Sequence, residues 1–91
     1  MNTRSFDIAE FLESDDDIRQ FLEEAASTGD TSDLIHALNI AARARGMSEV
    51  ARQSGVTRAS LYKSLSENGN PRLDTISKIA GAFGCRLTLV H

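Results

Sequence analysis

The sequence predicts a mainly α-helical domain with a helix-turn-helix near its centre and one short β-strand at its C-terminal end. Apolar residues recur at intervals of three and four through most of the 91 residues, as they do on one face of a helix. Two short helical stretches meet at Gly55 within ARQSGVTRASLYKSLS, and a tight glycine turn between helices is typical of a helix-turn-helix. The stretch CRLTLV alternates in character, which favours a strand. This length suits one domain.

Residues 1–29 are the first predicted region, an acidic segment of short helices. Ser14 suits an N-cap because its hydroxyl can accept a hydrogen bond from a first-turn amide. The next three residues, Asp15, Asp16 and Asp17, then lie at the positive end of the helix dipole. The apolar stripe of this helix is Ile18, Phe21, Leu22 and Ala25, and Gly29 ends it. An apolar cluster of no assigned structure precedes it: Phe6, Ile8, Phe11 and Leu12.

Residues 30–84 are the second predicted region, the helix-turn-helix domain. Asp30 or Thr31 caps its first helix, Gly46 ends it, and its buried stripe is Leu34, Ile35, Leu38, Ala41 and Ala42. We expect a short helix from Ser48 to Ser54 with Ser48 as its cap, and a helix from Arg58 to about Ser66 capped by Thr57. A loop dense in turn formers covers residues 68–71. The stripe of the last helix is Leu73, Ile76, Ile79, Ala80 and Phe83, and Gly84 ends it.

Residues 85–91 are the third predicted region, a dimerisation strand. A single strand leaves its backbone groups without partners, and no other stretch of the chain is clearly typical of a strand. We therefore expect antiparallel pairing with the same strand of a second subunit, so that the chain is a homodimer. The pairing residues are Arg86, Leu87, Thr88, Leu89 and Val90. Addition to the edge of another protein's sheet is the alternative.

The formal net charge of −3 is unevenly distributed along the chain. Residues 1–42 hold ten acidic and two basic residues, whereas residues 43–91 hold three acidic and eight basic ones. This asymmetry predicts a polyanion as the partner of the second half and a cationic protein as the partner of the first. Chance clustering on two solvated faces is the alternative.

The residues around the Gly55 turn suit contact with double-stranded DNA. Leu61 and Leu65 lie one helical turn apart and face inward, which leaves the remaining side chains of the second short helix outside. Arg and Lys bind guanine edges or phosphates, and Ser, Thr and Tyr supply further contacts. The expected DNA-binding residues are Thr57, Arg58, Ala59, Ser60, Tyr62 and Lys63, with Ser48 and Arg72 on flanking phosphates. In the alternative reading Arg58 pairs with Glu49, and Tyr62 packs on a neighbouring side chain.

Two stretches of the chain carry a resemblance to a known family. ARARGMSEVARQSGVTRASLYKSLSENGNPRLDTISKIAGAFGCRL resembles the core of the addiction-module antidote proteins, HigA-like antitoxins with a lambda-repressor-like helix-turn-helix. The leader FDIAEFLESDDDIRQFLEEAASTGD also resembles that family, so the likeness covers nearly the whole chain. It implies a dimeric five-helix fold, repression of the protein's own operon at its operator DNA, and neutralisation of a RelE-like ribonuclease toxin. Ser64 departs from the general pattern, which commonly has a larger apolar residue there.

The acidic half is the surface expected to face the toxin, since the resemblance implies that RelE-like toxins are basic. Its apolar anchors would be Phe6, Phe11, Leu12, Phe21 and Leu22, with Asp15, Asp16, Asp17, Glu23 and Glu24 steering association. In the alternative reading the aromatic residues belong to the core and the carboxylates cap helices, and Phe21 and Leu22 fit that reading better. Neutralisation by covering the active site and by holding the toxin away from the ribosome both stay open.

Several function classes find no support in the sequence. No catalytic constellation and no phosphate-cradling glycine loop is present, so we expect neither an enzyme nor a cofactor. Two histidines and the single Cys85 lie too far apart for a recognisable metal site or a disulfide framework. The N-terminus lacks a secretory signal, and no apolar run approaches the roughly 20 residues of a membrane span, so we expect a cytoplasmic protein. A stand-alone repressor and a dimeric interaction module are the other functions considered.

Overall fold

The computed structural model describes residues 8–88, and helices make up most of this part of the chain. A single 3-10 turn, η1, spans Ile8–Phe11. The five α-helices are α1 Asp15–Ser27, α2 Thr31–Arg45, α3 Met47–Ser54, α4 Arg58–Ser64 and α5 Leu73–Ala82. The predicted mainly helical fold is therefore confirmed. Among these described helices none is both long and apolar enough to cross a membrane.

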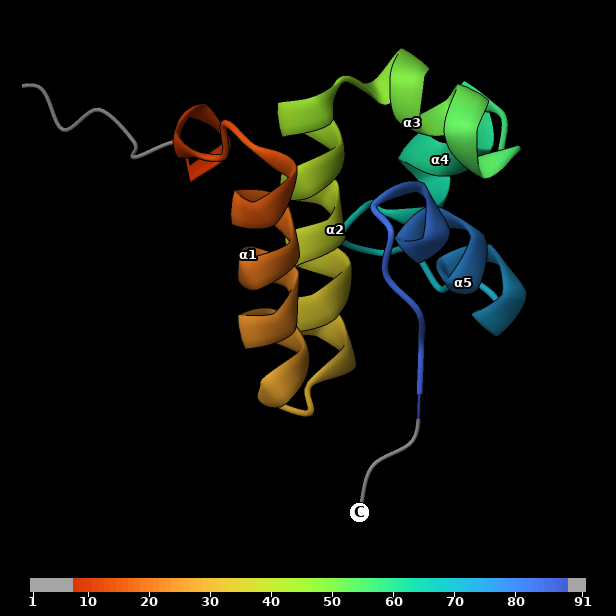
Figure 1. Ribbon diagram of the computed structural model, residues 1–91. Coiled ribbons are helices and arrows are strands. Elements are labelled where there is room, and N and C mark those ends of the chain that lie inside the picture. The colour runs from red at the N-terminus through yellow and green to blue at the C-terminus, as the bar shows by residue number, and fades with distance from the viewer. Residues whose placement is uncertain (1–7, 89–91) are drawn as a thin grey trace, which may run out of the picture.

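Helices α1 and α2 lie side by side as an antiparallel pair along one side of the domain (Figure 1). Ser14 caps α1 as predicted, because its Oγ accepts the backbone N–H of Asp17 at 3.0 Å. Asp17 Oδ2 accepts the backbone N–H of Ser14 at 3.2 Å in return, which completes a capping box. Asp30 caps α2 by accepting the backbone N–H of Ser32 at 2.8 Å. Short polar side chains therefore fix where both helices begin.

One hydrophobic core joins α1 and α2 to the three shorter helices beside them. Its largest fully buried side chains are Phe83, Leu38, Leu61, Ile79 and Val50. Leu61 and Leu65 face inward as predicted, with 0% and 2% of their surface exposed. Leu73 was wrongly assigned to the stripe of α5, since 72% of its surface is exposed. It occupies the first position of the helix, and the buried stripe begins one turn later at Ile76.

Helices α3 and α4 meet at a tight turn around Gly55, whose φ is +79°. A residue with a Cβ is strained in this left-handed conformation, whereas glycine adopts it freely. Val56 is buried in the angle of the turn, and Thr57 Oγ1 accepts the backbone N–H of Ser60 at 3.1 Å. The predicted turn and the predicted Thr57 cap are both confirmed.

Two predicted helix boundaries near this turn need correction. Helix α3 begins at Met47, with Gly46 in the cap position and no side-chain cap bond, so the prediction that Ser48 caps it was wrong. Burial of Met47 against the core explains the earlier start. Helix α4 ends at Ser64, two residues before the predicted end. The chain then turns back, and the backbone N–H of Gly69 donates to the carbonyl of Ser66 at 2.9 Å.

The chain beyond Gly84 runs away from α5 without regular structure as far as residue 88 (Figure 1). Cys85 is half-buried against the core, and its backbone N–H donates to the carbonyl of Ala80 at 3.0 Å. Residues 85–88 form no strand, while Leu89, Val90 and His91 lie outside the described residues. The C-terminal strand and its pairing across a dimer therefore stay predictions.

Candidate functional site

The outer surface of α4 presents the side chains that the sequence assigned to DNA. Because Leu61 is fully buried, the helix turns its other positions outward, and Arg58, Ala59, Ser60 and Lys63 are all exposed. Thr57, which caps the helix, is exposed as well. These residues separate into two adjoining flanks, one centred on Arg58 and the other facing α5.

The first flank is a pair formed by Arg58 and Tyr62, one turn apart on α4. Arg58 Nη2 donates to Tyr62 Oη at 3.3 Å, and its guanidinium lies 5.7 Å from the centre of the tyrosine ring. Half of the Tyr62 surface, 51%, remains exposed. The pair holds the guanidinium against the helix. Arg58 therefore loses less side-chain conformational entropy when it binds a ligand.

The alternative pairing of Arg58 with Glu49 does not occur in the structure. Glu49 instead accepts two hydrogen bonds from Arg52 of the same helix, at 2.5 and 3.2 Å. Those bonds hold the pKa of the Glu49 carboxyl below its usual value. The cationic group of Arg58 therefore has an aromatic neighbour and no carboxylate partner among these contacts.

The second flank is an open hollow between α4, the loop after it and α5. We call it the α4–α5 hollow, and its volume is about 650 Å³. Its lining includes four of the predicted DNA-binding residues, Thr57, Ser60, Lys63 and Arg72. It also includes Thr75 and Lys78 of α5, which were not among the predicted DNA-binding residues. Among the residues that line the hollow there are three cations and no carboxylate.

Ser48 and Arg72, the two residues predicted to contact flanking phosphates, differ in their relation to the hollow. Ser48 is exposed in the first turn of α3 and does not line it. Arg72 occupies the N-cap position of α5, where its Nε lies 3.5 Å from Asp74 Oδ1. Both side chains of this ion pair are mostly exposed, so the contact is weak and leaves Arg72 available to another anion.

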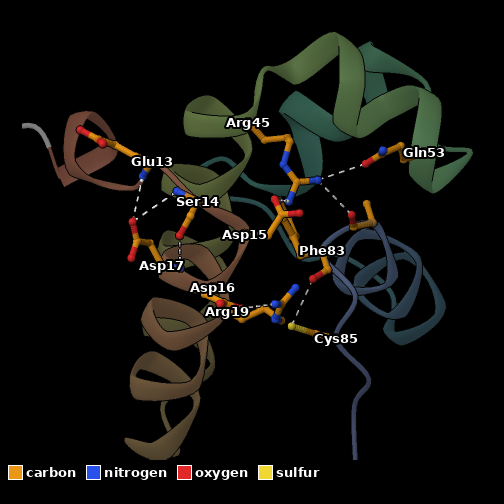
Figure 2. A network of polar contacts seen from close by, with 11 residues as sticks. Glu13, Ser14, Asp15, Asp16, Asp17, Arg19, Arg45, Gln53, Phe83 and Cys85 are labelled. Carbon is orange, nitrogen blue, oxygen red and sulfur yellow. Dashed lines mark hydrogen bonds and ion pairs between the residues drawn. The ribbon is translucent and has the colours of Figure 1, made fainter.

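The aspartates predicted to face a toxin make contacts within the chain (Figure 2). Asp15 pairs with Arg45, Asp16 pairs with Arg19, and Asp17 belongs to the capping box of α1. These three carboxylates therefore have structural roles, whatever else they do. Glu23 and Glu24 are also exposed on α1.

The predicted apolar anchors of the acidic half divide between surface and core. Phe11 exposes 59% of its surface at the end of η1. Leu12 and Phe21 are partly buried against the core, and Leu22 is a core residue with 5% exposed. Phe6 lies outside the described residues. The core alternative is therefore confirmed for Phe21 and Leu22, and among the described residues of this half Phe11 is an exposed aromatic residue.

Arg45 joins the acidic half to the rest of the domain (Figure 2). Its guanidinium donates to Asp15 at 2.6 Å, to Gln53 of α3 at 3.2 Å and to the carbonyl of Ala82 at 3.3 Å. It also lies 5.2 Å from the centre of the Phe83 ring. Four segments of the chain thus meet at one side chain, only 17% of which is exposed.

The described residues of the predicted dimerisation segment are exposed. Arg86, Leu87 and Thr88 follow Cys85 on the surface, and Leu87 exposes 38%. A small hollow of about 120 Å³ lies beside them, and Leu22, Leu38 and Ile76 contribute to its mainly apolar lining. These positions leave the segment accessible to another chain.

Comparison with known proteins places this chain in a family. Residues 2–91 match the family described as "Probable addiction module antidote protein", and the chain belongs to that family. A protein of Haemophilus influenzae described as uncharacterized is 40% identical over 80 residues, which are 88% of this chain and 82% of that protein. No solved structure gives a significant match. An antidote of an addiction module acts against a toxin, so the family implies a toxin partner.

Proposed function

We propose that this protein is the antitoxin of a toxin–antitoxin module and represses its own operon by binding operator DNA. Family membership over residues 2–91 is the observation that carries the antitoxin role. Both activities are binding events, without a catalytic step or a cofactor. The acidic half binds the toxin in this proposal, and the basic half binds the DNA.

The DNA-binding part of the proposal assigns α3 and α4 to a helix-turn-helix of the lambda-repressor-like kind, with α4 as the recognition helix. The tight Gly55 turn, the buried Leu61 and the outward Arg58 support this assignment. Pairing of the C-terminal segments would make a homodimer with two α4 helices. A homodimer binds a palindromic operator by placing those two helices in successive major grooves, roughly 34 Å apart.

Titration of two arginine variants tests the DNA-binding part. Arg58→Ala removes a group suited to a base edge, so we expect weaker operator binding and a smaller preference over scrambled DNA. Arg72→Ala removes a group suited to a phosphate, so binding to both sequences should weaken by a similar factor. Arg19→Gln, on α1, serves as the control for loss of one positive charge. Wild-type affinity in both test variants would refute the assignment.

The toxin-binding part of the proposal concerns η1 and α1. The cognate toxin is a RelE-like ribonuclease with a basic surface, and the antitoxin neutralises it by direct contact. Phe11 supports this role as an exposed aromatic anchor, and Glu23 and Glu24 supply negative charge that no ion pair described here engages. Charge complementarity of this kind mainly raises the association rate.

Binding kinetics with the purified toxin separate the anchor from the steering charges. Phe11→Ala should raise the dissociation rate at least roughly tenfold, as loss of an aromatic hot spot does. The double variant Glu23→Gln, Glu24→Gln should lower the association rate at low salt and change dissociation little. Glu67→Gln, in the loop after α4, is the control for charge. Unchanged kinetics in both variants would place the toxin interface elsewhere on the chain.

A stand-alone repressor without a toxin partner is the second candidate. The engagement of Asp15, Asp16 and Asp17 within the chain favours it, because it gives these acidic residues a structural role. The two candidates differ in one outcome. Operator binding together with no measurable binding to the product of the neighbouring gene would favour the repressor.

A further inference from the structure

Two sets of residues with the same spacing line the α4–α5 hollow. On one wall, Thr57, Ser60 and Lys63 follow one another at intervals of three residues along α4. On the other wall, Arg72, Thr75 and Lys78 follow at the same interval along α5. Residues three apart on a helix lie on one face, so each wall is a ladder with a hydroxyl at its middle and a lysine at its end.

The loop between the two helices packs closely on the end of α4. Gly69 packs on the end of α4 so closely that a Cβ there would lie 2.6 Å from the carbonyl oxygen of Ser64 and 2.7 Å from that of Lys63. Such distances exclude any side chain, so the loop reaches its position only with glycine at this point. The loop contributes Asn68, Gly69, Asn70 and Pro71 to the lining of the hollow.

The chemistry of the lining fits an extended polyanion with apolar parts. Three cations, five hydroxyl residues and two amides line it, and no carboxylate does. Val56 and Pro71 add apolar surface between these polar groups. A deoxyribose–phosphate backbone combines charged and apolar groups in this way, and most protein–DNA hydrogen bonds go to phosphate and sugar.

We propose that the α4–α5 hollow binds the sugar–phosphate backbone of one strand of double-stranded DNA, and that Thr75 and Lys78 contact its phosphates. The inference rests on the proposed DNA-binding function and extends it from α4 to α5. The backbone lies in the concave flank, while the Arg58–Tyr62 flank, which adjoins it, faces the base edges. Lys63 and Lys78 hold the strand from opposite walls.

The experiment titrates wild-type protein and four variants against a duplex from the region upstream of its own gene and a scrambled duplex of equal length. Lys78→Gln removes the cation, Lys78→Arg restores it, and Thr75→Val removes a hydroxyl at nearly constant volume. Arg19→Gln removes one positive charge on α1 and is the matched control. Each titration is repeated over a range of salt concentrations, and thermal unfolding verifies that each variant is folded.

Lys78→Gln should weaken binding to both duplexes by the same factor, roughly three- to tenfold near 0.1 M salt, and lower the slope of log affinity against log salt by about 0.9. Lys78→Arg should restore the wild-type slope, Thr75→Val should weaken both duplexes by a smaller factor, and Arg19→Gln should leave the slope unchanged. A wild-type slope in Lys78→Gln would overturn this inference alone. Failure of the wild-type protein to bind either duplex would overturn the proposed DNA-binding function and this inference together.

Two further arms identify the ligand. Inorganic phosphate and single-stranded RNA are added as competitors at matched ionic strength. We expect neither to displace the duplex from wild-type protein, because the three cations of the hollow can engage more than one phosphate of a strand at once. Preferential binding of RNA over the duplex, or displacement by phosphate that Lys78→Gln abolishes, would contradict the assignment of the hollow to DNA.

Discussion

Arg45 of α2 and Asp15 of α1 form an ion pair with 2.6 Å between Nη2 and Oδ1, although 30 residues separate them along the chain. The same guanidinium lies over Phe83, and it donates to Gln53 of α3 and to the last carbonyl of α5. Its neighbours therefore come from the toxin-facing helix of the proposal and from the elements that flank α4. The partly buried Arg45 therefore holds the proposed toxin-binding and DNA-binding surfaces in a fixed relative position.

Replacement of Arg45 tests this arrangement. Arg45→Met keeps an apolar side chain over Phe83 and leaves the Ala82 carbonyl and Gln53 without their donor. We expect a loss of about 2–3 kcal/mol in the free energy of unfolding. Asp15→Asn should cost less than about 1 kcal/mol, because Asp15 is mostly exposed. Urea denaturation measures both, and an equal cost in the two variants would contradict the shared role of Arg45.

Two glycines with opposite surroundings give a prediction about the α4–α5 hollow. Gly69→Ala forces a Cβ against two backbone carbonyls, so we expect a loss of about 1–3 kcal/mol and weaker DNA binding. Gly81→Ala is the matched control, because nothing lies within 4 Å of its Cβ position in α5. It should stabilise the protein by about 0.5–1 kcal/mol. Shifts of the same sign in the two denaturation midpoints would refute the close approach at Gly69.

The capping box of α1 gives a prediction about helix stability. Ser14→Ala removes the acceptor for the Asp17 amide and should cost about 1 kcal/mol in the free energy of unfolding. Ser77→Ala, at an exposed position inside α5, is the control and should be neutral or slightly stabilising. Denaturation curves of equal midpoint for the two variants would show that the cap contributes nothing.

Cys85 gives a prediction about pH. Burial raises the pKa of its thiol, and the nearby Arg19 only partly opposes this effect. The rate of alkylation should therefore reach its midpoint above the pH of about 8.5 expected for an unperturbed thiol, and unfolding in urea should restore that value. A midpoint below that of the unfolded chain would contradict the burial of the thiol.

The raised pKa of Cys85 also has a consequence for stability. The folded state holds the thiol proton more tightly than the unfolded state does. The protonated thiol therefore adds to the free energy of unfolding, and this contribution is fully present below the pKa of the unfolded state. It is lost as pH rises through the raised pKa of the folded state. Cys85→Ala should remove this part of the decline in stability at alkaline pH.

Local chemistry made much of the fold predictable from the sequence. Ser14, Asp30 and Thr57 cap helices because their short polar side chains reach nearby amides, and this reach depends only on neighbouring residues. Gly55 marks the α3–α4 turn for the same local reason. Leu73 shows that apolar periodicity alone does not predict burial. An apolar residue at helical spacing is exposed to solvent when the core does not extend to it.

The features of the site that the sequence did not reveal depend on contacts between distant segments. Lys78 and Thr75 occupy ordinary outer positions of α5, and only the packing of the 68–72 loop brings them opposite Lys63. Asp15 looked like a helix-dipole residue or a toxin contact, and its partner Arg45 lies on another helix. Periodicity and capping carry no information about such pairs, which follow from the packing of complete elements.

Neutralisation of a toxin by direct binding is the activity on which the proposed function depends. The most direct measurement follows the growth of cells that express the small protein encoded beside this gene, alone and together with this chain. Both genes are placed under inducible promoters, so that repression of the natural operon does not enter. We expect arrest by the small protein alone, rescue by this chain and equal rescue by Arg58→Ala, which affects only DNA binding. Arrest that this chain does not relieve, or no arrest at all, would contradict the proposed neutralisation.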